Sequence, residues 1–162
     1  MNSNDPDALR LVAQDEADMD VVSALLQDAI IAGADLHFDQ QNACFLMVVN
    51  RFCWERPALA GVKNSAGGVV HERALCGVRI SHVTQVQRHR WPADWRDAFF
   101  NILALKTVPV PQQSSAETAI EVSFSGGPSL RLLAKQIDIV LVDLDSGRPT
   151  NLQPRHDLED LN

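Results

Sequence analysis

The richest concentration of chemistry-bearing side chains lies in one stretch, residues 88–96. It contains three arginines, one histidine and two tryptophans: Arg88, His89, Arg90, Trp91, Trp95 and Arg96. Guanidinium groups bind carboxylates and phosphates, and indole rings supply rigid contact area, so both residue types recur at recognition surfaces. The composition predicts a loop that binds a peptide, a phosphate group or a nucleic-acid strand. The alternative, which we favour for these residues, is a crossing loop whose tryptophans cap the barrel and whose arginines offset nearby Asp94 and Asp97.

A second polar group, Asn50, Arg51 and Glu55, follows the longest apolar run of the chain. The run Cys44–Val49 is apolar on both alternating faces, which predicts a central strand with both faces covered. Polar residues at the end of such a strand often line the mouth of a barrel, where they bind a ligand. The sequence therefore offers these three residues as a second candidate site.

Arg51 and Glu55 also have a structural interpretation. On an extended strand they lie on one face but about 13 Å apart, which is too far for a direct contact. Each then needs a partner from a neighbouring strand, and Arg73 or Arg79 is a candidate partner for Glu55. We favour this cross-strand pairing over a ligand site.

Motifs for catalysis or metal binding are missing from the sequence. The histidines have none of the ligand spacings of metal sites, and Ser123–Gly127 lacks the spacing of a nucleophile elbow. The cysteines are odd in number and contain no Cys-x-x-Cys pair, so we expect buried, reduced thiols. The sequence therefore predicts no catalytic residue, no metal and no cofactor.

The acidic composition bears on the class of partner. The chain of 162 residues has a formal net charge of −7, which disfavours nucleic acid as the main partner. Residues 57–118 differ, because they hold seven basic and four acidic residues, a net charge of +3, and leave room for a local anion site. We therefore expect a protein partner or self-association, for example as a homodimer.

Length and hydropathy predict the domain organisation and the cellular location. The length suffices for one core, so we expect one globular domain at residues 1–147 and a polar tail at residues 148–162. The N-terminus is acidic where an export signal is basic and then apolar, and no apolar run is long enough to span a membrane. We expect a cytoplasmic protein that does not contact the membrane.

One amphipathic helix is expected near the N-terminus. Asp15 is a suitable N-cap, apolar residues follow at helical spacing up to Ile30, and Gly33 is placed to end the helix. Residues 137–144 are ambiguous, because their β-branched side chains favour a strand while their apolar spacing favours a helix. We favour a short helix there.

The rest of the chain reads as strands joined by turns. Alternating patterns and turn residues predict one hairpin at residues 36–49 and another at residues 120–134, and a strand at Val83–His89. Successive strands joined by short turns pair antiparallel. We therefore expect an α+β fold, a meander of about seven mainly antiparallel strands that curls into a pleckstrin-homology-like barrel. A helix-covered open sheet is the alternative.

Several segments resemble one known family. They are residues 9–30, Asn50–Glu55, Gly77–Val83, Phe124–Gly127 and Pro154–His156. Together they are similar to an uncharacterised bacterial family, catalogued as a conserved domain of unknown function, over nearly the whole chain. The resemblance implies a stand-alone bacterial protein of this size, and it implies no activity, cofactor or catalytic residue.

Two functions from different classes follow from these residues. The first is a non-enzymatic binding or adaptor module that contacts its partner through the loop at 88–96 and a sheet edge. The second is an enzyme that acts on a small anionic substrate at the barrel mouth, with Asn50, Arg51, His82 and Glu55 as its candidate residues. Nucleic-acid binding through the same loop is a third hypothesis, which the net charge disfavours.

Overall fold

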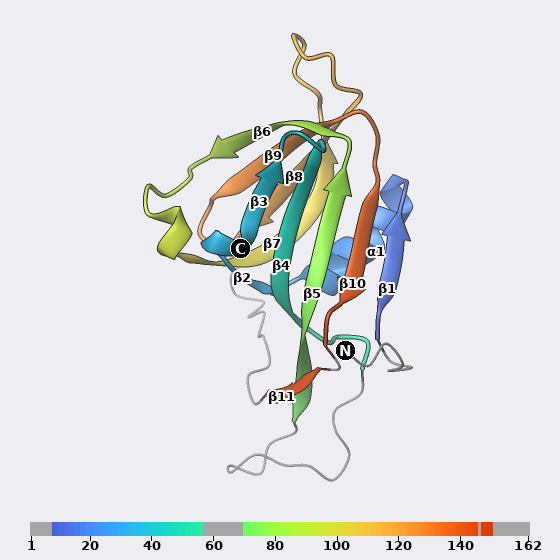
Figure 1. The fold of residues 1–162 in the computed structure, drawn as a ribbon, viewed down its shortest axis with the longest axis vertical. Coiled ribbons are helices and arrows are strands. Elements are labelled where there is room, and N and C mark those ends of the chain that lie inside the picture. Colours follow the sequence, from blue (N-terminus) through green and yellow to red (C-terminus); the bar gives the residue numbers. More distant parts are fainter. Residues whose placement is uncertain (1–7, 57–69, 146, 151–162) are drawn as a thin grey trace, which may run out of the picture.

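One large antiparallel sheet and one α-helix make up the fold (Figure 1). The structure is a computed structural model that describes residues 8–56, 70–145 and 147–150. The strands are β1 (Arg10–Ala13), β2 (Ile30–Ala32), β3 (Leu36–Asp39), β4 (Cys44–Phe52), β5 (His71–Ser81), β6 (Val83–His89), β7 (Phe99–Val108), β8 (Thr118–Phe124), β9 (Ser129–Ala134), β10 (Ile139–Asp143) and β11 (Arg148–Thr150). The helix α1 spans Glu16–Leu26, and two short 3₁₀ helices, η1 and η2, span Gly33–Asp35 and Trp95–Asp97.

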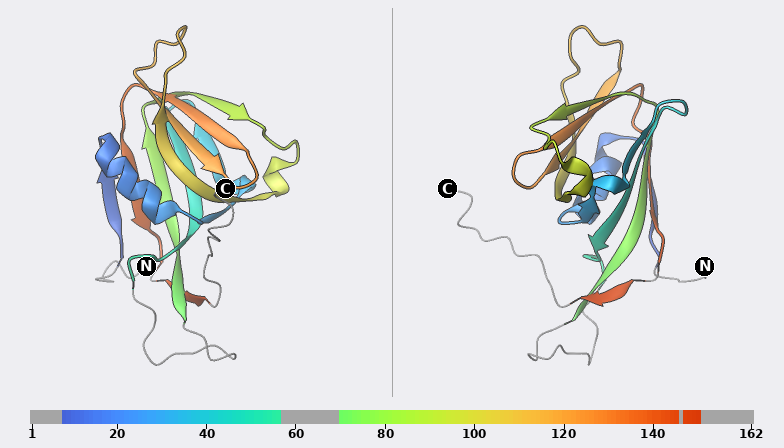
Figure 2. Two further views of the ribbon diagram at one scale, coloured as in Figure 1. Left: turned by 180° about the vertical axis from the view of Figure 1, so that it is seen from behind. Right: turned by 60° about the vertical axis from the view of Figure 1, so that its left-hand side comes forward.

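The strands follow the order β1-β10-β5-β4-β2-β7-β8-β9-β6, with β11 paired to β5 and β3 paired to β4. The predicted antiparallel sheet is confirmed, but about seven strands was too few. Figure 2 shows that strands β6 to β9 fold across β3, β4, β5 and β10, so that the core lies between the two halves. Because the order has two ends, β1 and β6, the sheet is not closed as a barrel. The likeness to a pleckstrin-homology domain stays a prediction.

Strand β4 lies in the centre of one half of the sheet, as its apolar run predicts. It pairs with β5 along its whole length, from Cys44 opposite Ser81 to Phe52 opposite Arg73. Only one of its faces is covered, however, since Leu46 and Val48 on the outer face are 36% and 39% exposed. The prediction of two covered faces was wrong because, among the described residues, helix α1 and the other half of the sheet lie on the inner face alone.

Helix α1 begins where the sequence predicts. Asp15 is the N-cap, and its Oδ1 accepts a hydrogen bond of 2.8 Å from the backbone N–H of Asp18. The helix ends at Leu26 rather than near Gly33, because Asp28 has a positive φ of 64° and residues 30–32 pair with β7 and β4 as strand β2. Pairing with two strands satisfies the backbone there, so the prediction of a longer helix was wrong.

The predicted hairpins are confirmed, and the predicted C-terminal helix is not. Strands β3 and β4 pair as one hairpin and β8 and β9 as the other. Residues 139–143 form strand β10, which pairs with β1 on one side and β5 on the other. Two neighbouring strands form backbone hydrogen bonds with β10. This pairing outweighs the preference for a helix that the spacing of its apolar side chains indicates.

The predicted C-terminal tail starts inside the sheet. Arg148–Thr150 form β11 against β5, and the rest of the tail lies outside the described residues. Across the described parts of the chain, no helix is both long enough and apolar enough to cross a membrane.

Candidate functional site

A cleft opens between strands β3 and β6, which each pair with a neighbour on one side only among the described residues. We call it the edge cleft. Its volume is about 360 Å³, and its lining consists of seven apolar side chains and one arginine: Leu36, Phe38, Phe45, Val86, Arg88, Trp91, Trp95 and Leu130. This volume lies at the lower end of the range for small-ligand sites, about 300–1,000 Å³, and the mostly apolar lining is typical of them.

Backbone contacts hold both ends of β3. At one end, the N–H of Val83, the first residue of β6, donates to the carbonyl of Ala43 at 2.9 Å. At the other end, the N–H of Gly33 donates to the carbonyl of Ala98 at 2.8 Å, which fastens η1 against η2. The carbonyl of Trp95 occupies the place where a Cβ of Gly33 would lie, so only glycine fits there. These contacts fix the width of the edge cleft.

The loop at residues 88–96, the Arg/Trp loop, places its tryptophans on the core. Trp91 stacks on Phe100 with 4.8 Å between ring centroids and 9° between planes, and its ring lies 5.8 Å from that of Phe124. Trp95 lies 6.1 Å from Trp91. Both indoles are half-buried against the core cluster, so the tryptophans cover the core, although the sheet is not closed as the barrel that the structural interpretation expected. The Nε1 of Trp91 is buried and has no hydrogen-bond partner.

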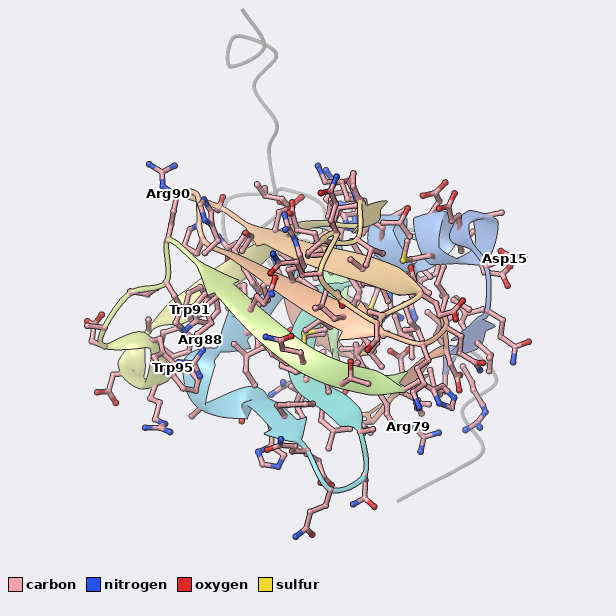
Figure 3. The ribbon with its side chains drawn as sticks, turned by 90° about the horizontal axis from the view of Figure 1, so that it is seen from above. Asp15, Arg79, Arg88, Arg90, Trp91 and Trp95 are labelled. Atoms are coloured by element: carbon pink, nitrogen blue, oxygen red, sulfur yellow. The ribbon has the colours of Figure 1, made fainter. Side chains whose placement is uncertain are left out.

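The arginines of the loop do not make the contacts that the structural interpretation predicts. The guanidinium carbons of Arg88 and Arg96 lie 4.9 and 4.8 Å from the ring centroid of Trp95 (Figure 3). No carboxylate of the described residues forms an ion pair with Arg88, Arg90 or Arg96, although Asp94 is close in sequence. The prediction that these arginines pair with the nearby aspartates was wrong, because the guanidiniums of Arg88 and Arg96 lie over the indole of Trp95 and that of Arg90 lies beside Gly127.

Two residues of the loop point elsewhere. Arg90 has a positive φ of 52°, and its guanidinium lies beside Gly127 in the turn between β8 and β9. His89 lines a more polar hollow of about 560 Å³ on the outer face of strands β6 to β9, and Arg88 belongs to the lining of this hollow as well as to that of the edge cleft. Figure 3 shows Arg88, Trp91 and Trp95 grouped at one end of β6 and Arg79 beyond its other end. The structure therefore gathers Arg88, Trp91, Trp95 and Arg96, whereas Arg90 lies beside Gly127 and, of the two hollows, His89 lines the polar one.

Two residues of the second group, Arg51 and Glu55, form an ion-pair cluster with Asp143, which we call the buried ion-pair cluster because the side chains of Arg51 and Asp143 are fully buried. The Nε and Nη2 of Arg51 each donate to Asp143 at 2.8 Å, and its Nη1 and Nη2 donate to Glu55 at 2.9 and 2.7 Å. Oδ2 of Asp143 also accepts from the N–H of Leu9 at 3.0 Å. Burial disfavours the charged form of Arg51, but the hydrogen bonds to Asp143 and Glu55 outweigh it and raise the pKa of Arg51.

Direct contact between Arg51 and Glu55 contradicts the predicted separation of about 13 Å. Strand β4 ends at Phe52, and a turn follows in which the N–H of Arg56 donates to the carbonyl of Cys53 at 3.1 Å. This turn brings Glu55 back to Arg51. Neither Arg73 nor Arg79 is the partner of Glu55, and Arg73 instead donates to the carbonyl of Asn50 at 3.2 Å. The missed residue is Asp143, which lies 92 positions from Arg51 in the sequence.

The candidate residues of the enzyme hypothesis do not all meet, because His82 lies away from the contact between Arg51 and Glu55. Arg51 lies opposite Ala74 on β5, whereas His82 follows the other end of β5 and pairs with Asp138 at 3.3 Å. The side chain of Asn50 has a buried oxygen without a hydrogen-bond partner, and the donors of Arg51 face carboxylates. These four residues therefore do not form one pocket.

The three cysteines are poor candidates for a reactive site. Cys44, Cys53 and Cys76 are buried free thiols, as predicted, and burial raises the pKa of Cys76 to about 12. A thiol with a raised pKa is a poor nucleophile at neutral pH. Among the residues that the structure describes, no group of three or more histidine, cysteine or acidic side chains is placed to hold a metal ion.

Comparison with known proteins identifies the chain by family. A family model described as a protein of unknown function, DUF2948, matches residues 9–156. The chain belongs to this family. The matched range contains the edge cleft, the Arg/Trp loop and the buried ion-pair cluster, and the resemblance predicted from the sequence is confirmed at the level of the family. Searches of curated proteins and of solved structures found no match.

The sequence missed most of the lining of the edge cleft. Leu36, Phe38 and Phe45 belong to a hairpin that the sequence predicts, but nothing local shows that β6 lies across from it. The side-chain alternation of β6 is the one local pattern that indicates part of this lining. Val86 and Arg88 are two residues apart and therefore share a face, which links the arginine of the loop to an apolar position.

Proposed function

We propose that this protein is a non-enzymatic binding module that contacts a protein partner through the edge cleft and the Arg/Trp loop. The observation that carries the proposal is the cleft itself, an apolar hollow between two strand edges that no described residue pairs with, with exposed Arg88 in its lining. Its described lining contains no carboxylate, hydroxyl, thiol or imidazole group. A site without a nucleophile or a general base is suited to binding rather than to catalysis.

The charge around the cleft selects an acidic partner. Residues 88–96 hold three arginines and one aspartate, a net charge of +2 with histidine neutral, on a chain whose net charge is −7. An exposed cation–π contact is worth about 0.5–1 kcal/mol, whereas a hydrogen bond to a charged group is worth about 1.5–3 kcal/mol. A carboxylate of the partner therefore competes well with the Trp95 ring for the guanidinium of Arg88 or Arg96.

The half-buried indoles supply the apolar part of the contact. Trp91 and Trp95 are held by the core and by η2, so they lose little conformational freedom when a partner binds. Rigid aromatic side chains next to arginine are the composition of interface hot spots. A protein segment with an apolar side chain next to an acidic one fits both halves of the site.

The test compares two charge-reversal variants with the wild-type protein. The double variant Arg88→Glu, Arg96→Glu reverses the charge of the site. Arg79→Glu reverses the charge of an exposed arginine on β5 and is the matched control. Each protein carries a photo-crosslinking amino acid in place of Ala93, an exposed position of the loop, and crosslinked segments are identified by mass spectrometry. Urea unfolding of each variant checks that the fold is intact.

We expect the wild-type protein and the Arg79 variant to crosslink to the same segments of the partner. We expect these segments to contain Asp or Glu close to an apolar residue. The double variant loses these crosslinks. Equal crosslinking by the double variant overturns the proposal, and so do crosslinks in which the only target is a second copy of the chain or a nucleic acid.

A further inference from the structure

We infer that the partner binds as an extended segment that pairs with the free edge of β6, places an apolar side chain in the edge cleft and an acidic side chain on Arg88. This inference rests on the proposed function, and it adds the conformation and the side-chain pattern of the partner. Three observations support it: the unpaired edge of β6, the side-chain alternation along this strand and the absence of acidic residues from it.

Within residues 8–56, 70–145 and 147–150, no strand pairs with the outer edge of β6. Strand β6 has seven residues and pairs with β9 on one side, whereas β1, at the other end of the sheet, has only four. Proline, lysine and β-bulges are common protections of an edge. Residues 83–89 contain no proline or lysine, and the irregular register between Val83 and Gln85 leaves Gln85–His89 in regular pairing with β9. The N–H of Val83 already donates to a carbonyl outside β9, that of Ala43. The backbone of β6 can therefore accept a neighbour on this side.

The alternation of β6 fixes what an added strand must carry. Val86 and Arg88 lie opposite Leu132 and Leu130 of β9, two buried residues, so both side chains lie on the face that lines the cleft. In an added strand every second side chain also faces the cleft, and cross-strand neighbours interact directly. The residue beside Val86 is therefore apolar and the residue beside Arg88 is acidic. The recognised pattern is an apolar and an acidic residue two positions apart.

Other occupants fit these observations less well. A lipid or a free phosphate has no alternating N–H and C=O groups to pair with a strand edge, although either offers an anion to Arg88. A second β6 offers the backbone but no carboxylate, because residues 83–89 contain no Asp or Glu. An extended segment of another protein supplies the backbone, the apolar group and the acid together.

The first experiment selects peptides without assuming a partner. A displayed library of random nine-residue peptides is selected on the wild-type protein and counter-selected on the Arg88→Glu, Arg96→Glu variant. We expect the enriched peptides to share an apolar and an acidic residue two positions apart. Moving the acid of the best peptide by one position turns it to the other face of the strand, and we expect this matched control to bind at least about tenfold more weakly.

The second experiment tests strand pairing separately from side-chain contacts. Each backbone N–H of the best peptide is methylated in turn, and the affinity is measured by fluorescence anisotropy. In a strand every second N–H points to the neighbour, so we expect losses of about three- to tenfold at alternate positions and none between them. Amide hydrogen exchange is expected to slow in β6 and to stay unchanged in β1, the other end strand.

The outcomes separate the inference from the proposed function. Peptides whose affinity is insensitive to methylation overturn strand pairing but leave the binding function standing. A library that yields no peptide specific for the wild-type protein overturns the extended-segment inference, while the crosslinking experiment decides the proposed function independently. Binding of phospholipid vesicles or inorganic phosphate in place of peptides also overturns the extended-segment inference.

Discussion

Arg51 on β4 and Asp143 on β10 form a bidentate ion pair, with two N–O distances of 2.8 Å and both side chains fully buried. Strand β5 lies between β4 and β10, so the pair spans three neighbouring strands. Asp143 also accepts from the N–H of Leu9, next to β1. The pair therefore joins the N-terminal segment, strand β10 and the centre of the sheet.

We expect Asp143→Asn to destabilise the protein by about 3–5 kcal/mol, because it leaves the buried guanidinium of Arg51 without a full counter-charge. Urea unfolding monitored by circular dichroism measures the loss. The control is the double variant Arg51→Met, Asp143→Leu, which removes both charges and is expected to lose less than Asp143→Asn. If Asp143→Asn were as stable as the wild-type protein, the ion pair would contribute nothing to the free energy of unfolding.

The stability of the fold depends on pH through Glu55. Burial disfavours its charged form, but the hydrogen bonds from Arg51 outweigh burial and hold its pKa below the ordinary value. Because the folded-state pKa is depressed, the stabilisation is complete above the unfolded-state pKa of about 4.3 and is lost as the pH falls through the folded-state pKa. We expect the difference in unfolding free energy between the wild-type protein and Glu55→Gln to shrink below this pH. A constant difference from pH 7 to pH 3 contradicts the assignment.

Gly33 is expected to tolerate no side chain. The carbonyl of Trp95 occupies the position of its Cβ, so Gly33→Ala forces η1 away from η2 and costs about 1–3 kcal/mol. Gly77 on β5 is the matched control, because its Cβ would meet the side chain of Leu144 at an ordinary 3.6 Å. Gly77→Ala is expected to leave stability unchanged or to raise it by up to about 1 kcal/mol. Thermal unfolding of both variants distinguishes these results.

Trp91 is expected to stabilise the fold through its stacked ring. Trp91→Ala removes the ring that stacks on Phe100, and we expect a loss of about 3–5 kcal/mol. Trp91→Phe keeps an aromatic ring and removes an N–H that is buried without a partner, so we expect a loss smaller than that of the alanine variant. Urea unfolding measures both. Equal losses would show that the stacked ring is not what stabilises this region.

The thiols are expected to be inert in the folded protein. Burial raises the pKa of Cys44, Cys53 and Cys76, in the case of Cys76 to about 12, which leaves almost no thiolate at neutral pH. An aromatic disulfide reagent at pH 8 should react with all three thiols in urea and with none at a comparable rate in the native state. A single fast thiol in the native protein would identify an opening near that cysteine.

Local patterns determined much of the fold and the family resemblance. The N-cap of Asp15, the apolar run at 44–49 and the turn glycines Gly126 and Gly127 act through neighbouring residues, so the sequence shows them directly. The same holds for the concentration of arginine and tryptophan at 88–96 and for the cysteines that proved to be buried thiols. Propensity and turn chemistry need no knowledge of the far side of the molecule.

The contacts between segments far apart in the chain became visible in the three-dimensional structure alone. Strand β10 was mistaken for a helix because its partners β1 and β5, which settle its conformation, are remote in sequence. Asp143 was missed as the partner of Arg51 for the same reason. The edge cleft exists because the hairpin of β3 and β4 lies across from β6, which places Phe38 and Phe45 beside Arg88. Burial and pairing between segments far apart in the chain are collective, so no local pattern specifies them.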